Sequence, residues 1–148
     1  MTRDRTLLVL LRLAMGWFMF YAGITKVLNP AWTAAGYLRG AKTFSGFYQW
    51  LASPANIGWV NVLNEWGLTL LGISLILGIG IRLSGALGAA LMLLYYLPIL
   101  EFPRVGHGYL VDEHVVYALV FLYLSAARAG RIFGIEEWCA GLPICRRF

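Results

Sequence analysis

Residues 57–80 read IGWVNVLNEWGLTLLGISLILGIG, and this stretch is the clearest indication of the fold class. Its one charged residue is Glu65, and the run is long enough to cross a bilayer core, which takes about 20 apolar residues of α-helix. Working outward from it, three further apolar runs occupy about 6–28, 83–100 and 112–127. We therefore expect an all-α integral membrane protein whose four transmembrane helices form one bundle.

The composition of the whole chain agrees with this fold class. Of its 148 residues, 60% are hydrophobic and 13% are charged, whereas soluble domains have roughly 45–50% and about 25%. A soluble enzyme, a disordered chain and a disulfide-stapled secreted module are thereby excluded. The net charge of +5 is better explained by basic residues facing the cytoplasm than by nucleic-acid binding. We expect a single membrane domain over 1–148, with the lipid bilayer as its first partner.

The basic residues also predict an orientation. Four spans place both termini on one side, and that side would carry seven basic residues against four on the other. Because cytoplasmic loops are the ones enriched in lysine and arginine, both termini are expected in the cytoplasm, with the plasma membrane as the location. Residues 132–148 then form a short cytoplasmic tail, in which Cys139 and Cys145 are expected to be free thiols.

One long connection, 29–56, separates the first two spans. It is rich in aromatic residues, namely Trp32, Tyr37, Phe44, Phe47, Tyr48 and Trp50. Tryptophan and tyrosine favour the headgroup zone of a membrane. We expect an interfacial loop with short helices lying on the outer leaflet and covering the bundle.

Polar and small residues recur at helical spacing within the spans. In the first span they are Arg12, Gly16, Met19, Gly23 and Lys26, which share one face at about 100° per residue. Charged groups in a span normally face the bundle interior, and glycine permits close helix approach. Similar stripes start at Asn61, Gly85 and His114 in the other spans, so the four helices are expected to share one interior.

Most of these polar positions lie toward the extracytoplasmic ends of the spans, where we expect a polar site. Its candidate residues are Lys26, Asn61, Asn64, Glu65, Tyr95, Tyr96, His114 and Tyr117. Lys26 and Glu65 are the expected ion pair, because a carboxylate inside a span needs a partner, a proton or water. Arg12 lies near the opposite end, where its long side chain can extend to the cytoplasmic headgroups or pair with another group.

Each candidate also has a purely structural interpretation. Lys26 can extend to the outer headgroups, and Asn61 and Asn64 can form hydrogen bonds between helices. The tyrosines can serve as packing and interfacial residues. His114 follows two acids at a helix start, where it is either a proton-handling or an interfacial residue.

The sequence gives no reason to expect a haem or a metal. Its two histidines, His107 and His114, lie seven residues apart near one face, whereas the ligands of a haem in a bundle usually come from different helices. Cys139 and Cys145 have the spacing C-x5-C, which is neither a C-x-x-C redox motif nor a zinc pair.

Three motifs resemble a known family. They are Arg12-x3-Gly16-x6-Gly23-x2-Lys26-x3-Pro30 in the first span, Asn64-Glu65-Trp66-Gly67 leading to Gly78 and Arg82 in the second, and the 129–136 segment AGRIFGIE. In order and spacing they are similar to the DoxX/DoxD family of small four-helix membrane proteins. The resemblance implies a membrane bundle, and DoxD members are the membrane subunit of thiosulfate:quinone oxidoreductase, which works with a separate small partner.

Three function classes follow. The first is a quinone-reactive or membrane-anchoring subunit of a redox complex, with Glu65 and His114 as catalytic residues and Lys26, Asn61, Asn64, Tyr95, Tyr96 and Tyr117 as quinone-binding residues. Its electrons would come from a partner subunit or a bound sulfur substrate, since no electron carrier is evident in the sequence. The second class is a non-enzymatic scaffold, either a homo-oligomer or part of a larger complex. The third is a small proton-coupled transporter using Glu65, which the position of Pro98 near a span end disfavours.

Overall fold

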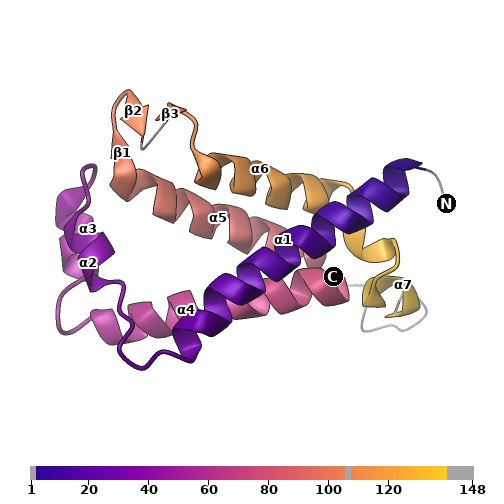
Figure 1. Ribbon diagram of the computed structural model, residues 1–148, viewed down its shortest axis with the longest axis horizontal. Helices are drawn as coiled ribbons and strands as arrows, with labels where there is room; N and C mark the ends of the chain where they lie inside the picture. Colours follow the sequence, from indigo (N-terminus) through magenta and orange to yellow (C-terminus); the bar gives the residue numbers. More distant parts are fainter. Residues whose placement is uncertain (1–2, 106–107, 140–148) are drawn as a thin grey trace.

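The long helices of the bundle have the lengths that the sequence predicts for membrane spans. The computed structural model describes residues 3–105 and 108–139 and is mostly helical (Figure 1). Helices α1 (Arg3–Val27), α4 (Ile57–Leu77) and α5 (Ile81–Ile99) are each long and apolar enough to cross a membrane. The expected fourth span is α6 (Glu113–Ala126), which is apolar but has only 14 residues. At 1.5 Å per residue it measures about 21 Å, less than a bilayer core of about 30 Å. A four-span topology therefore stays a prediction.

The long helices pack in two pairs. Helix α1 packs along α4, and α5 packs along α6, whereas α4 and α5 make few contacts with each other. The two pairs diverge toward the end of the molecule that carries α2 (Ala35–Arg39) and α3 (Ser45–Leu51) (Figure 1). The other end carries the α4–α5 turn, the 3₁₀ helix η1 (Ala129–Arg131) and α7 (Ile135–Cys139). We call these the α2–α3 end and the α7 end.

The glycine-bearing faces predicted for the spans form the helix contacts. On α1, Arg12, Gly16, Met19 and Gly23 are all buried. A methyl group added at Gly72 of α4 would collide with the backbone of α1, so at this crossing only glycine fits. The second pair also packs closely through glycine, because Gly85 and Gly88 of α5 lie against α6.

The turn between α4 and α5 requires glycine for its backbone. Gly78 and Gly80 have φ values of +66° and +64°, in the left-handed region that other residues seldom adopt. Gly78 also lies against Gly134 and the guanidinium of Arg12, so a side chain at this position would have no room. The turn thereby fixes the α7 end, where the two helix pairs meet.

Two small substructures cover the α2–α3 end. Helices α2 and α3 enclose a minor apolar core that includes Leu38, Tyr48 and Val60, and Lys42 N donates to the Pro98 carbonyl of α5. A three-stranded antiparallel sheet, β1 (Leu100–Glu101), β2 (Arg104–Val105) and β3 (Gly108–Tyr109), follows α5; the sequence did not predict it. Contact of the 29–56 connection with a membrane interface stays a prediction. Tyr48, however, is buried and donates to the Leu94 carbonyl at 3.0 Å, so it is not an interfacial side chain.

Arg12 holds the α7 end together. Its side chain is only 1% exposed and donates to the backbone carbonyls of Ala129, Ile132 and Phe133, at 2.5, 2.9 and 2.9 Å. Glu136 lies beside this cluster and accepts a hydrogen bond from Ile81 N, which caps the start of α5. Of the two alternatives for Arg12, extension to the headgroups is wrong, because the residue is enclosed and paired with backbone. The first residues of the expected 132–148 tail are thus part of the folded bundle.

Candidate functional site

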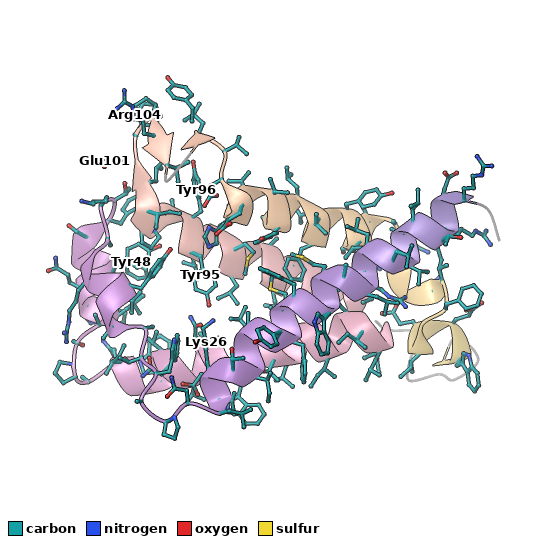
Figure 2. All side chains as sticks on the ribbon, viewed as in Figure 1. Lys26, Tyr48, Tyr95, Tyr96, Glu101 and Arg104 are labelled. Atoms are coloured by element: carbon teal, nitrogen blue, oxygen red, sulfur yellow. The ribbon has the colours of Figure 1, made fainter. Side chains whose placement is uncertain are left out.

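A polar pocket lies at the α2–α3 end. It has a volume of about 290 Å³ and combines residues from α1, α4, α5 and α6 with residues of the 29–56 connection. Its lining consists of Lys26, Trp32, Thr33, Ala34, Tyr37, Asn64, Tyr95 and His114. Four of the candidate residues from the sequence, Lys26, Asn64, Tyr95 and His114, are therefore brought together. Figure 2 labels two of them, Lys26 of α1 and Tyr95 of α5. We call this cavity the polar pocket.

Lys26 enters the pocket from the last turn of α1. Its ammonium group lies 5.3 Å from the centre of the Trp32 ring, within the range of a cation–π interaction. In the described part of the chain, the side-chain ion pair found is His114–Asp112. The expected Lys26–Glu65 ion pair is therefore not a direct contact, although the Glu65 carboxylate lies near enough to act electrostatically on Lys26. A partly buried ammonium without a direct ion pair can still bind an electronegative ligand atom.

A chain of tyrosines forms one wall of the pocket. Tyr37 of α2 donates its hydroxyl to the backbone carbonyl of Tyr95, and the Tyr95 hydroxyl donates to Asn64 Oδ1 at 2.6 Å. Burial raises the pKa of Tyr37 to about 12, and the nearby carboxylate of Asp112 acts in the same direction. With this pKa, Tyr37 stays protonated and a hydrogen-bond donor even at a pH at which an ordinary tyrosine loses its proton. These bonds join α2, α4 and α5 across the pocket.

His114 is positioned by the cap of α6. Asp112 is the N-cap residue, and its side chain accepts hydrogen bonds from His114 N and Val115 N, as acids at a helix start are expected to do. Its second oxygen lies 2.6 Å from His114 Nδ1. A carboxylate on Nδ1 leaves Nε2 as the other exchangeable nitrogen of the ring. The imidazole also meets the Tyr95 ring edge-on, with centroids 5.8 Å apart.

The structure places the other candidate residues away from the pocket lining. Glu65 is half-buried on α4 next to Asn64. Asn61 accepts from Ala34 N at 3.0 Å and so holds the start of α2. Tyr96 donates to the Leu110 carbonyl, and the Tyr117 ring packs on Phe18 of α1, with centroids 5.1 Å apart. The quinone-related roles given to all these residues stay predictions.

Sequence reasoning missed the part of the pocket that the 29–56 connection supplies. Trp32, Thr33, Ala34 and Tyr37 were not candidate site residues, although Trp32 and Tyr37 stood out as aromatic. A usable signal was the short distance in sequence between Lys26 and Trp32, since a chain that reverses at Asn29-Pro30 returns over the end of α1. His107, Cys145 and the side chain of Cys139 lie outside the described residues.

Long apolar helices, paired through buried glycines and closed over a polar pocket at one end, define a small helical integral membrane protein. A comparison with protein families identifies which one. The DoxX family model matches residues 7–99, more than half of the chain, and the chain belongs to the DoxX family. This confirms the resemblance seen in the sequence motifs. Comparisons with curated proteins and with solved structures found no match.

Proposed function

We propose that the chain is the membrane subunit of a redox complex and that its polar pocket receives the ring of a quinone. The observation that carries the proposal is the convergence of Lys26, Asn64, Tyr95 and His114 around about 290 Å³ at one end of an apolar bundle. A small-molecule site typically combines apolar walls with a few placed polar groups. A quinone ring matches this, because it is flat and apolar with two carbonyl acceptors. Assignment to the thiosulfate:quinone type is the finer part of the proposal.

The side chains around the pocket suit the two carbonyl oxygens of a quinone. Reduction to the quinol adds two electrons and two protons, and negative charge develops on the oxygens. His114, held by Asp112, would donate a proton to one oxygen. Lys26 would stabilise the charge on the other oxygen through its ammonium group, which is held in place beside Trp32.

Asn64 and Tyr95 would orient the ring. Their mutual hydrogen bond uses the carboxamide oxygen of Asn64, so its nitrogen is the end that can donate to a ligand. Glu65 follows Asn64 on α4, and we assign it the delivery of protons from the aqueous side to the pocket. Asn61, Tyr96 and Tyr117 would act on the ring only through the elements that they position.

The proposal also includes the source of the electrons and the side of the membrane on which the polar pocket opens. The electron pair would come from a partner subunit or from a sulfur compound bound by the complex. With both termini in the cytoplasm, the polar pocket would open at the extracytoplasmic side of the plasma membrane. Its proton exchange would then take place with that compartment.

A non-enzymatic scaffold is the second candidate. It is favoured by the exposed aromatic side chains Phe44, Phe47 and Trp50 on and beside α3, which a partner chain could cover. The buried glycines of the spans do not support a scaffold, since they make contacts between helices of this chain itself. A transporter is less well supported, because Pro98 lies in the last turn of α5 and interrupts no helix near its middle.

The proposal is tested by quinone binding to the full chain in a gentle detergent. We expect wild type to retain quinone through purification and to bind a tail-less benzoquinone, and Lys26→Met to lose most of this binding. Lys42→Met is the matched control, because Lys42 is exposed on the connection outside the pocket. Absence of quinone binding by wild type would contradict the proposal and leave the scaffold.

A further inference from the structure

Three exposed arginines lie on neighbouring segments at the α7 end. Arg82 is in the first turn of α5, Arg128 directly precedes η1, and Arg131 is the last residue of η1. A methyl group added at Gly130 would collide with the Ile81 side chain, so η1 packs against the start of α5. Arg131 and Arg82 are the chain neighbours of these two residues. Arg131 N also donates to the Arg128 carbonyl at 2.9 Å, which places all three arginines on one small part of the surface.

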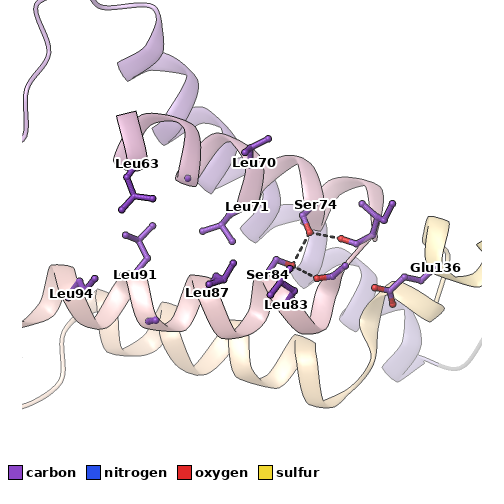
Figure 3. Close-up of a pocket in the computed structure, with 14 residues that line it drawn as sticks. Leu63, Leu70, Leu71, Ser74, Leu83, Ser84, Leu87, Leu91, Leu94 and Glu136 are labelled. Carbon is purple, nitrogen blue, oxygen red and sulfur yellow. Dashed lines mark hydrogen bonds between the residues drawn. The ribbon is translucent and has the colours of Figure 1, made fainter. Parts of the chain in front are cut away.

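Hydrogen bonds fix the turn that precedes Arg82. Ser74 and Ser84 are joined through their hydroxyls at 2.8 Å, and each also donates to a backbone carbonyl of the α4–α5 turn (Figure 3). Glu136 of α7 lies beside this turn and accepts a hydrogen bond from Ile81 N at 2.8 Å. Because these bonds hold α5 and α7 together, the backbone positions of the three arginines are fixed relative to one another.

The acids of α7 are bonded to backbone groups. Besides Glu136, Glu137 accepts a hydrogen bond from Phe133 N at 3.2 Å. In the part of the chain that the structure describes, the side-chain salt bridge found lies at the α2–α3 end. The three arginines of the α7 end are therefore exposed and make no salt bridge with a described residue.

The two ends of the molecule differ in net charge. At the α2–α3 end, cations and acids are equal in number, with Lys26, Arg39, Lys42 and Arg104 against Glu65, Glu101, Asp112 and Glu113. Among the described residues of the α7 end, cations outnumber acids, with Arg3, Arg5, Arg12, Arg82, Arg128 and Arg131 against Asp4, Glu136 and Glu137. A surface with excess positive charge attracts anions. The α7 end is therefore the end that suits an anionic partner.

Two exposed aromatic side chains, Phe133 and Trp138, lie on the segment that follows these arginines. Their exposed fractions are 70% and 89%. Tryptophan is favoured at the headgroup level of a membrane, where its apolar ring and its polar N–H are both accommodated. A soluble anion would leave both rings in water, whereas the boundary between headgroups and acyl chains takes up such rings beside basic residues.

The arginines also lie at the level where the spans end. Helix α4 ends at Leu77, and α5, which is long enough to cross a membrane, begins at Ile81. Residues in a turn between two spans lie at the depth of the lipid headgroups. Guanidinium groups bind phosphate through two parallel N–H donors, so arginine suits a headgroup phosphate.

We propose that the α7 end binds the headgroup of an acidic phospholipid in the adjacent leaflet. Arg82, Arg128 and Arg131 would hold the phosphate, and Phe133 and Trp138 would lie at the boundary with the acyl chains. The excess of cations at this end would favour acidic lipids over neutral ones. The site goes beyond the proposed function, because it lies at the opposite end from the polar pocket and requires no quinone.

The test is a titration of the full chain in non-ionic detergent micelles with phosphatidylglycerol, read by native mass spectrometry. Phosphatidylcholine is the neutral probe, and wild type should bind it more weakly. The combined substitutions Arg82→Gln, Arg128→Gln and Arg131→Gln should weaken phosphatidylglycerol binding by about 10²-fold, since each arginine near an acidic lipid surface contributes about fivefold. Binding of phosphatidylcholine should not change.

The matched control removes the same charge at the other end of the molecule. Arg39→Gln, Lys42→Gln and Arg104→Gln replace three exposed cations, which acids of equal number accompany there. Phosphatidylglycerol binding should fall by less than about threefold in this variant. Thermal unfolding and gel filtration check that both triple variants are folded.

A double variant separates a lipid from a soluble anion. Phe133→Ser with Trp138→Ser should weaken phosphatidylglycerol binding by about tenfold, because the rings no longer lie against the acyl boundary. Inorganic phosphate, the soluble probe, should not displace the lipid from wild type. Unchanged lipid binding in the double variant, or displacement by phosphate, would overturn the lipid assignment.

The triple variants decide whether these particular arginines form the site. Equal loss of phosphatidylglycerol binding in both would reduce the effect to net charge, and unchanged binding in the α7-end variant would remove the site. Equal affinity of wild type for the two lipids would also overturn the proposal. So would a co-purifying acidic protein that is lost from the α7-end variant while the lipid is retained.

Discussion

Arg12 and Lys26 lie on the same face of α1, fourteen residues apart, and end in opposite surroundings. Arg12 is enclosed at the α7 end, where three backbone carbonyls accept its hydrogen bonds. Lys26 is only half-buried at the α2–α3 end, where it faces a cavity and one aromatic ring and has no direct ion pair, with Glu65 acting on it from a greater distance. The hydrogen bonds of Arg12 are thus made within the fold, whereas the ammonium group of Lys26 is accessible to a ligand.

The same contrast holds for the acids at the two ends. Glu136 caps α5 beside Arg12 and belongs to the packed structure. Asp112 caps α6, and with its second oxygen it also holds His114 at the pocket. One end is therefore expected to respond to substitution through stability, and the other through ligand binding and turnover.

The largest effect on stability is expected for Arg12→Met. The substitution leaves the buried carbonyl of Ala129 and two partly buried carbonyls without their donor, so the free energy of unfolding should fall by about 3–5 kcal/mol. Denaturant unfolding in detergent micelles measures the change. Arg5→Met on the same helix is the control, because Arg5 is exposed, and it should alter stability by less than about 0.5 kcal/mol. Equal stability of the two variants would show that the hydrogen bonds of Arg12 do not stabilise the α7 end.

Glu65→Gln tests whether the α2–α3 end responds to substitution through activity rather than through stability. If Glu65 delivers protons to the pocket, the uncharged amide should lower thiosulfate-dependent quinone reduction by about 10²-fold or more, with little change in unfolding. The assay uses membranes that contain the assembled complex. Glu101→Gln, an exposed site on β1, is the matched control and should behave as wild type. Wild-type turnover in Glu65→Gln would remove this residue from the mechanism.

Lys26→Met tests the other half of the Arg12–Lys26 comparison. Loss of the cation–π contact should cost only about 0.5–1 kcal/mol of stability, because the site is partly exposed. Affinity for a quinone should fall by about tenfold, equivalent to about 1.4 kcal/mol. Calorimetric titration and thermal unfolding of the same preparation separate the two. A large loss of stability with unchanged affinity would make Lys26 a second structural cation.

The helices and their faces could be predicted because they depend on local chemistry. The run at 57–80 corresponds to α4 at Ile57–Leu77. Of the stripe predicted on α1, all members but Lys26 are buried, and Leu8 and Met15 are buried beside them. The Lys26–Glu65 contact could not be predicted in the same way, because helical periodicity gives the face that a residue occupies on its own helix and not its distance to a side chain on another helix.

Contacts between distant segments could not be predicted in this way. The partners of Arg12 are carbonyls at 129–133, and main-chain acceptors leave no mark on residue type. The two left-handed residues there, Arg128 and Phe133, are also not residues that favour such a backbone. The pocket wall from Trp32 to Tyr37 depends on how the 29–56 connection folds back, which helical periodicity does not describe.

The smallest effect is expected for the hydrogen bond between Asn64 of α4 and Tyr95 of α5. Tyr95→Phe removes the hydroxyl that donates to Asn64, and hydrogen bonds between helices in membranes contribute about 0.6 kcal/mol on average. A double-mutant cycle with Asn64→Leu isolates this coupling, because each single variant removes the same bond. Tyr123→Phe, an exposed position on α6, is the control. A coupling near zero would mean that the Asn64–Tyr95 hydrogen bond does not contribute to holding α4 and α5 together at the α2–α3 end.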